Sequence, residues 1–441
     1  MCSWSRTRPK ATSTRCSSSG HPGRDPLRPR LTSHRGVRCT LAVTRHALGS
    51  CGPARSTSPA SPTAATAADS TRWATSGVTW NGSSPPGPCR SASSSRASRR
   101  GARLHGTRCA AFFTQACAVN VVFAHAWAGR LRLPVVDASP PDELPGLPAG
   151  LAPDDLPTEV IDRVWILVYR DLLLRQCEGL GVADHVLVNS FYELQTKEAE
   201  YMATRWVAKT VGPSVPSAYL DNRLPDDTSY GFHLHAPMTA EAMAWLDKRP
   251  AHSVVYVSFG SLVALDPDQM AEVAKGLYNS GKAFLWVVRA SETSKLPKGF
   301  ADKAEQRGLI MSWCPRLDVL AHPAIGCFLT HCGWNSTMEG LGAGVPMVAM
   351  PQWADQPMNA KYIDDVWRVG VRVRSDPQGM VCRQEMARCV KEVMEGEMSK
   401  QYRDNARSWS IKAKKAMSEG GTSDNNMVEF LAQLRPNCLG P

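Results

Sequence analysis

The sequence predicts an α/β fold in which the larger domain is built on a doubly wound, mostly parallel sheet. From Ala236 onward, short apolar runs alternate with segments of helical periodicity, an order that is typical of βαβ units. At 441 residues the chain is long enough for two domains with sizeable cores. In such sheets a ligand lies beyond the carboxyl ends of the strands, so residues that follow the apolar runs are the candidates for a site.

Strands of this domain are predicted at residues 254–257, 284–288, 308–311, 326–330, 345–350 and 369–373, and helices at residues 266–278 and 358–367. Ahead of a polar linker at residues 221–237, strands are predicted at residues 109–113 and 185–189. The second of these strands is followed by a predicted helix in SFYELQTKEAEYM. A last helix is expected in TSDNNMVEFLAQL, after Gly420 and Gly421.

A strand, a tight turn and a helix start follow one another around His331 and Gly333, with the helix expected from Ser336 to about Gly344. A helix start offers unpaired N–H groups and the positive end of the helix dipole, so it can hold a diphosphate without a cation. Asn335 and Ser336 are expected to cap this helix and to donate to phosphate oxygens, although capping alone would also explain such a pair. Glu339, on the same face, could accept two hydrogen bonds from a ribose diol.

The stretch from Trp313 to Gln356, WCPRLDVLAHPAIGCFLTHCGWNSTMEGLGAGVPMVAMPQWADQ, resembles the donor-binding box of plant family-1 UDP-sugar glycosyltransferases. The resemblance extends from about Cys109 to the C-terminus and implies a GT-B-type fold, two Rossmann-like domains facing a cleft. It implies that Trp313 stacks on uracil, that Glu339 holds the ribose, and that the residues from His331 to Ser336 surround the phosphates. The full set of donor-binding residues that it implies is Thr114, Ser261, Trp313, Cys314, Arg316, His331, Gly333, Trp334, Asn335, Ser336, Glu339, Asp355 and Gln356.

Within this set, Asp355 and Gln356 resemble the pair that hydrogen-bonds the sugar hydroxyls, and a terminal Gln in the family usually accompanies glucose. UDP-glucose is therefore the expected donor substrate, with no metal and no other cofactor. Ser261, in SVVYVSFGS, resembles an additional phosphate contact, and Thr114 corresponds to a position near the primary hydroxyl of the sugar. Arg316 departs from the family, which usually has Gln there, and its bulk and charge are expected to weaken or reshape nucleoside binding.

The first 110 residues differ in composition from the rest of the chain. They contain 18 Lys and Arg, of which 17 are Arg, against Asp25 and Asp69, so their net charge is +16 while the remainder carries −5. Their Ser, Thr, Pro, Ala and Arg bias and their shortage of apolar runs do not suit the first strands of an α/β domain. We expect residues 1–108 to replace the first half of the acceptor domain, which leaves that domain incomplete or disrupted.

Three interpretations of this segment stay open. It could be a transit peptide, because it is rich in Arg and Ser and poor in acids, or an Arg-rich arm that binds nucleic acid. The favoured interpretation is a disrupted reading frame, from a gene-prediction error, a pseudogene or a sequencing fault. Moving the frame two bases across residues 9–15 permits Gln-Gly-His-Ile-Asn-Pro, which is the family's N-terminal motif with its catalytic His. The same move across residues 55–66 also permits family-like sequence.

The family transfers glucose with inversion, using a His that takes the proton from the acceptor and a buried Asp that orients the His. Neither is present at the expected places: residues 82–110 contain no acid, and His21 lacks a preceding strand to hold it. The catalytic residues of this chain are therefore unknown. The leading hypothesis is a UDP-glucosyltransferase for a hydroxyl or carboxyl of a small hydrophobic acceptor, close to the subgroup that glucosylates carboxylic acids and hormone-like molecules.

The alternatives are a non-catalytic UDP-sugar binder or pseudogene product, and an Arg-driven nucleic-acid-binding protein with salt-sensitive association. Beyond the segment 1–108, the expected domains are the remaining acceptor domain at 109–220, a linker at 221–237, a UDP-sugar-binding domain at 238–415 and a returning helix at 416–441. No apolar run is long enough to cross a bilayer. We expect a cytoplasmic monomer with reduced cysteines, a UDP-sugar and a small acceptor as ligands, and no metal or nucleic acid.

Overall fold

The computed structural model describes residues 2–3, 40–41, 109–135, 144–161, 167–230 and 239–434, and the structural statements below refer to these residues. Most of the segment 1–108, including His21, lies outside them, and so do residues 231–237 of the expected linker.

The larger of two sheets, here called the second sheet, has six strands in the order β11-β10-β9-β6-β7-β8, and all neighbours are parallel. Its strands are β6 (Val254–Ser258), β7 (Ala283–Val287), β8 (Gly308–Met311), β9 (Ile325–Thr330), β10 (Met347–Ala349) and β11 (Gly370–Arg372). The chain order runs outward in both directions from the β6–β9 pair, so the topological switch point lies between these two strands. The predicted doubly wound parallel sheet is confirmed.

The central strands β6, β9 and β10 are buried along their whole length because helices cover both faces of the second sheet. In β6, Val255 and Val257 belong to one apolar core and Val254 and Tyr256 to another, as the alternation of side chains along a strand requires. The first of these cores also takes residues from α7 (Pro267–Asn279) and α12 (Arg383–Glu395). The remaining helices of this half are α6 (Thr239–Leu246), α8 (Phe300–Ala304), α9 (Arg316–Ala321), α10 (Trp334–Ala343) and α11 (Gln356–Lys361).

Several predicted boundaries were wrong by a few residues, for local reasons. The strand expected at 345–350 pairs only over Met347–Ala349, since Pro346 has no N–H and the N–H of Val345 donates to Gly340. The helix expected at 358–367 begins at Gln356 and passes into a π-helical turn at Tyr362–Val366.

The helix expected directly after residue 189 begins later, as α5 (Thr196–Trp206), behind the 3-10 turn Tyr192–Leu194. Gln195 lies outside this helix, and its Oε1 accepts a hydrogen bond of 2.8 Å from the backbone N–H of Cys117. That contact ties the start of α5 to the start of α2 (Cys117–Trp127).

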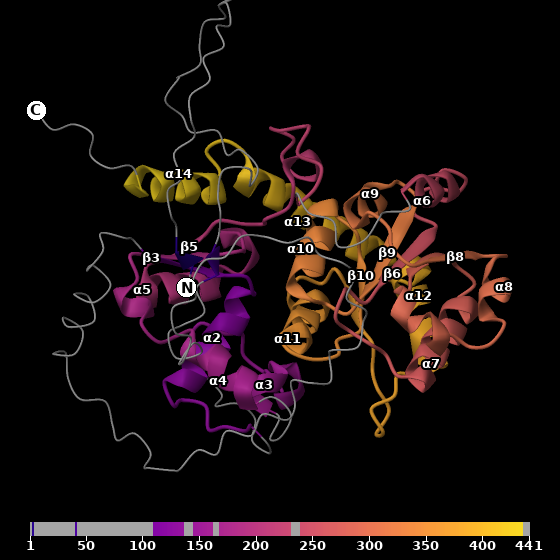
Figure 1. Ribbon diagram of the computed structural model, residues 1–441, viewed down its shortest axis with the longest axis horizontal. Helices are drawn as coiled ribbons and strands as arrows, with labels where there is room; N and C mark the ends of the chain where they lie inside the picture. Colours follow the sequence, from indigo (N-terminus) through magenta and orange to yellow (C-terminus); the bar gives the residue numbers. More distant parts are fainter. Residues whose placement is uncertain are drawn as a thin grey trace, which may run out of the picture.

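The smaller sheet, here called the first sheet, has the order β2-β1-β3-β4-β5. Its parallel strands are β3 (Cys109–Phe113), β4 (His185–Val188) and β5 (Ala208–Thr210). The pieces β1 (Cys2–Ser3) and β2 (Thr40–Leu41) add to its edge in antiparallel orientation. Figure 1 shows α2, α4 (Leu167–Arg175) and α5 on this side of the molecule, and the second sheet on the other.

The last two helices return from the second sheet to the first. After α13 (Ser399–Met417), the helix α14 (Thr422–Leu434) lies across the first sheet (Figure 1). Ser423 Oγ donates to Gly212 O at 2.6 Å and Asn426 Nδ2 donates to Thr210 O at 2.9 Å. Phe430 packs with Ala110 and Leu187, two residues of the first sheet.

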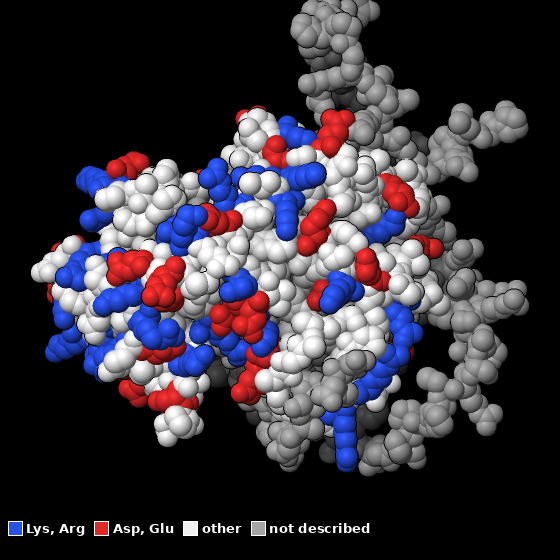
Figure 2. Space-filling model, turned by 180° about the vertical axis from the view of Figure 1, so that it is seen from behind, with Lys and Arg blue, Asp and Glu red and all other residues white. Residues whose placement is uncertain are grey.

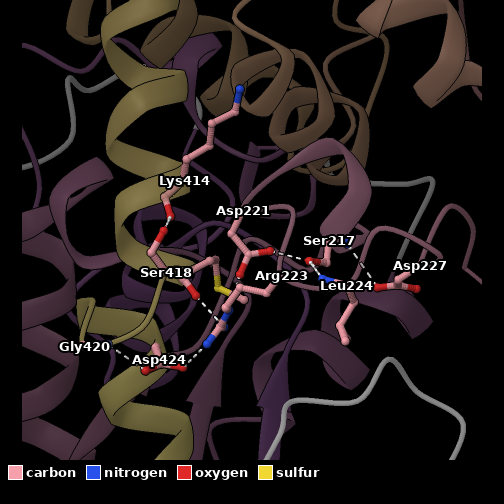
Figure 3. Close-up of polar contacts among 10 residues, drawn as sticks. Ser217, Asp221, Arg223, Leu224, Asp227, Lys414, Ser418, Gly420 and Asp424 are labelled. Atoms are coloured by element: carbon pink, nitrogen blue, oxygen red, sulfur yellow. Dashed lines mark hydrogen bonds and ion pairs between the residues drawn. The ribbon is translucent and has the colours of Figure 1, made fainter. Parts of the chain in front are cut away.

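Arg223, in the linker, fastens this return (Figure 3). Its Nη1 lies 2.9 Å from Asp424 Oδ1 in α14, its Nη2 donates to Met417 O at the end of α13, and its Nε donates to Asp221. Asp221 also accepts a hydrogen bond from Ser217 Oγ. One guanidinium thus joins the linker to the α13–α14 junction.

On the face shown in Figure 2, Lys and Arg are interspersed with Asp and Glu. The excess of Arg belongs to residues 1–110 of the sequence. Within the part of the chain that the structure describes, no helix has the length and apolarity needed to span a membrane.

Candidate donor site

Three loops leave the carboxyl ends of adjacent strands at the switch point, and each contains a residue in the left-handed region. These residues are Gly260 after β6 (φ 70°), Cys332 after β9 (φ 65°) and Ala354 after β10 (φ 58°). Non-glycine residues rarely adopt such angles, and they are often found at functional sites. The second sheet therefore places three loops with left-handed residues side by side, at the edge where a ligand is expected.

His331 is enclosed between two glycines in these loops. A Cβ atom placed on Gly260 would lie 2.8 Å from Cε1 of His331, and one placed on Gly333 would lie 2.5 Å from Nε2, so a larger residue fits at neither position. His331 is buried, and burial lowers its pKa to about 4, with the charge of Arg316 acting in the same direction. The imidazole is neutral at pH 7 and presents one N–H donor.

The helix after this loop, α10, begins at Trp334 rather than at Ser336, and its N-cap is Gly333. The prediction that Asn335 and Ser336 cap the helix is wrong, because both lie inside its first turn. Among the described residues, no side chain caps α10 at its start, which leaves its first N–H groups for a ligand. Asn335 is exposed, whereas Trp334 is buried and its Nε1 donates to Asn189 O of the first-sheet half at 2.7 Å.

Glu339 is buried in α10, and both of its carboxylate oxygens have protein partners. Oε1 accepts a hydrogen bond of 2.8 Å from the hydroxyl of Tyr230, and Oε2 accepts one of 2.6 Å from Nη1 of Arg316. The same Nη1 donates to Ser336 Oγ at 2.9 Å. The structure therefore brings together three residues of the predicted set, Arg316, Ser336 and Glu339, as one polar cluster.

Trp313 and Cys314 lie between β8 and α9. Trp313 is half-buried. Cys314 is buried with its Sγ 3.6 Å from the hydroxyl of Tyr256, and burial raises the pKa of this thiol to about 11. The Cys314 side chain thus belongs to the core, and only its backbone is available to a ligand.

Asp355 and Gln356 lie where α11 begins, and both are buried. Asn359 donates one hydrogen bond of 2.9 Å to Asp355 Oδ2 and one of 2.9 Å to Cys332 O, so it fixes Asp355 to the His331 loop. Burial raises the pKa of Asp355 to about 6. Gln356 Oε1 accepts from the backbone N–H groups of residues 352 and 353 at 2.9 and 3.1 Å, which turns its amide NH₂ to other partners.

The two remaining predicted residues are exposed. Ser261 follows Gly260, and Arg289 holds this loop by donating to Ser261 O and, at 2.6 Å, to Val263 O. Thr114 follows β3 in the first sheet and is separate from the other predicted residues in both sequence and sheet.

The first-sheet half also contributes side chains that the sequence did not indicate. Thr158 exchanges two hydrogen bonds with Ala354, of 2.8 and 3.0 Å, and so places Glu159 beside the Asp355 loop. Glu159 is buried, its Oε2 lacks a hydrogen-bond partner in the described part of the chain, and burial raises its pKa to about 7, with the charge of Asp355 acting in the same direction. Nearby, Asp155 pairs with Arg372 at 2.8 Å across the two halves.

The arrangement combines an uncapped helix start, a neutral imidazole and three buried carboxylates, with Arg316 as the cation beside them. Such a set can hold an anion at the helix start and hydroxyl groups at the carboxylates. Among the described residues, no group of three or more His, Cys, Asp or Glu side chains is placed to hold a metal ion.

Proteins of similar sequence and structure are known for most of this chain. The family profile for UDP-glucoronosyl and UDP-glucosyl transferase matches residues 194–415. Crocetin glucosyltransferase 2 of Crocus sativus is 50% identical over 335 residues, which are 75% of this chain and 72% of that protein. The flavonol 7-O-beta-glucosyltransferase UGT74F1 of Arabidopsis thaliana is 48% identical over 335 residues, with the same shares of 75% and 72%.

Among solved structures, that of Os79 from O. sativa in complex with UDP is similar, with a TM-score of 0.72, 48% identity and coverage of 76% of this chain and 75% of that one. A second structure of Os79, in complex with U2F and trichothecene, has a TM-score of 0.69 and 46% identity, and covers 76% of this chain. These matches confirm the expected GT-B-type fold.

Proposed function

The chain belongs to the plant family-1 UDP-glycosyltransferases, and on that premise we propose that it transfers glucose from UDP-glucose to a small hydrophobic acceptor. The acceptor offers a hydroxyl or a carboxyl group, and the transfer inverts the anomeric carbon. The two relatives named above are glucosyltransferases for crocetin and for a flavonol, which are small molecules. The proposed class of acceptor rests on such relatives alone.

The observation that carries the donor half of the proposal is the uncapped start of α10 beside a buried carboxylate. In this proposal the first N–H groups of α10, with Asn335, Ser336 and the neutral His331, hold the diphosphate. Glu339, one turn further along the helix, accepts the ribose hydroxyls, and Trp313 stacks on uracil.

The sugar is assigned to the loop held by Asn359. Asp355 and the amide NH₂ of Gln356 hydrogen-bond its hydroxyls, and Thr114, from the first sheet, is assigned to its primary hydroxyl. Ser261, in the loop after β6, is assigned to the phosphates. Cys314 and Gly333 take part through their backbones. No metal is needed in this proposal, because the helix start stabilises the departing diphosphate.

Transfer further requires a base that takes the acceptor proton as its oxygen attacks the anomeric carbon. The family's His and Asp are absent from the places in this sequence where they are expected. That observation favours a second candidate function, a UDP-sugar-binding protein without turnover. Under both candidate functions we propose the domain boundaries that were expected from the sequence. We also propose that the protein is a monomer and lies in the cytoplasm.

One assay separates the two candidates. The full chain is incubated with UDP-glucose and, in separate reactions, a flavonol, crocetin and a trichothecene, and glucosides are detected by mass spectrometry. UDP binding is measured on the same preparation by calorimetry. A glucoside supports the transferase, UDP binding without a glucoside supports the binder, and a folded chain that does neither contradicts both.

A further inference from the structure

Arg316 stands at the junction of two proposed subsites. Its Nη1 bridges Ser336, in the first turn of α10, and Glu339, one turn later, at 2.9 and 2.6 Å. The first residue belongs to the proposed diphosphate site and the second to the proposed ribose site. The guanidinium therefore occupies space that a bound nucleotide would share, and its carboxylate partner is the group that the ribose needs.

Both carboxylate oxygens of Glu339 already have protein partners. Arg316 holds one oxygen, Tyr230 holds the other, and the carboxylate is only 4% exposed. Ribose hydroxyls must compete with a charge-assisted hydrogen bond, which is stronger than one between neutral groups. Uridine alone brings hydrogen-bond acceptors but no negative charge to replace the carboxylate beside the displaced guanidinium.

A diphosphate does bring such a partner. Arg donates from several N–H groups in a fixed fork and binds phosphate as well as carboxylate, often through two parallel bonds. Both hydrogen bonds recorded for Arg316 leave from Nη1, so its other N–H groups can meet an arriving phosphate. Because His331 is neutral at pH 7, with its pKa lowered to about 4 by burial and by Arg316, it does not supply the positive charge here.

We infer that Arg316 is a phosphate-operated latch on Glu339. In the unliganded chain the latch is closed and Glu339 is neutralised. When a nucleotide binds, the guanidinium exchanges Glu339 for the diphosphate, and the freed carboxylate accepts the ribose hydroxyls. The inference rests on the proposed function, and it makes Arg316 a specificity-determining residue that favours uridine nucleotides carrying a diphosphate over uridine.

The test compares the dissociation constants of uridine and UDP for the full chain, with uridine measured by its displacement of UDP. In Arg316→Gln the latch is absent, so uridine binds about tenfold more tightly than it does to the wild type. UDP gains nothing, because the loss of its cation offsets the release of Glu339, so the ratio of the uridine constant to the UDP constant falls about tenfold. Tyr230→Phe is the matched control: it removes the other partner of Glu339 without touching the charge, so both constants shift together and the ratio stays.

A ratio that is unchanged or larger in Arg316→Gln overturns the latch. So does an Arg316→Gln variant from which uridine displaces UDP no more readily than it does from the wild type. Absence of UDP binding in every variant, including the wild type, instead overturns the proposed function. If Arg316→Gln does not fold, a crystal structure of the wild-type chain with UDP decides the question. A guanidinium bound to phosphate and parted from Glu339 supports the latch, and an unchanged Arg316–Glu339 pair overturns it.

Discussion

The second sheet and the first sheet differ in what the described residues complete. The second sheet has six parallel strands with helices on both faces, and its half of the chain carries twelve of the thirteen predicted donor-binding residues, in loops and in helices α9, α10 and α11. The first sheet has three parallel strands and two short antiparallel pieces, and it contributes Thr114. Under the proposed function, donor recognition is encoded in one contiguous stretch of chain, whereas the transfer step depends on the other half, and the two functions can fail separately.

The largest expected effect comes from replacing part of the half that contains the first sheet. Replacing residues 1–108 by the corresponding segment of crocetin glucosyltransferase 2 should raise the rate of glucose transfer by about 10²–10⁴-fold, the usual contribution of a general base. The rate is measured as UDP release with crocetin as acceptor. Equal rates for the native chain and the chimera would show that the native chain already contains a working base.

In the half that contains the second sheet, removing Glu339 tests whether the Arg316–Glu339 ion pair also stabilises the fold. Glu339→Ala leaves the Arg316 guanidinium without its carboxylate, so the free energy of unfolding should fall by about 3 kcal/mol. Urea unfolding followed by Trp fluorescence measures the change. Asp404→Ala, which breaks the exposed Lys400–Asp404 pair, is the control and should leave the transition midpoint where it is. Equal midpoints for the two variants would contradict the prediction.

Glu159 probes the contact between the halves through pH. Its pKa is raised from 4.5 to about 7, so between these values the folded chain keeps a proton that the unfolded chain releases. Stability is therefore lost as pH rises from 4.5 to 7, and then levels off. Glu159→Gln escapes this loss and should be more stable than the wild type by about 3 kcal/mol at pH 8, with little difference near pH 4.5. Parallel stability curves for the two proteins would refute this account of Glu159.

The smallest expected effect is at the return of α14 to the first sheet. Arg223→Ala leaves Asp221 and Asp424, both largely buried, without their shared guanidinium. Because Arg223 itself is 33% exposed, the loss of stability should be modest, about 1 kcal/mol. Backbone amide hydrogen exchange in α14 should be faster in Arg223→Ala than in the wild type. Arg175→Ala, which breaks the exposed Arg175–Asp171 pair, serves as the control. If exchange in α14 were equally fast in Arg175→Ala, Arg223 would have no special role in holding this helix.

The sequence predicted the strands of the second sheet closely because each is a short apolar run, as strands covered by helices require. It also placed His331 and Gly333 in one loop after a strand, where the structure has them. It did not reveal the cap of α10, since a Gly N-cap has no side chain to recognise. The partners Tyr230 and Glu159 were missed because they are distant in sequence from Glu339 and Asp355, and no local pattern marks such contacts.

Calorimetric titration of the full chain with UDP-glucose tests most directly whether the second-sheet half holds a complete donor site. We expect saturable binding of one UDP-glucose per chain with a dissociation constant below about 1 mM, and weaker binding of UDP-galactose. A folded chain that shows no saturable binding of UDP-glucose at that concentration would contradict this expectation.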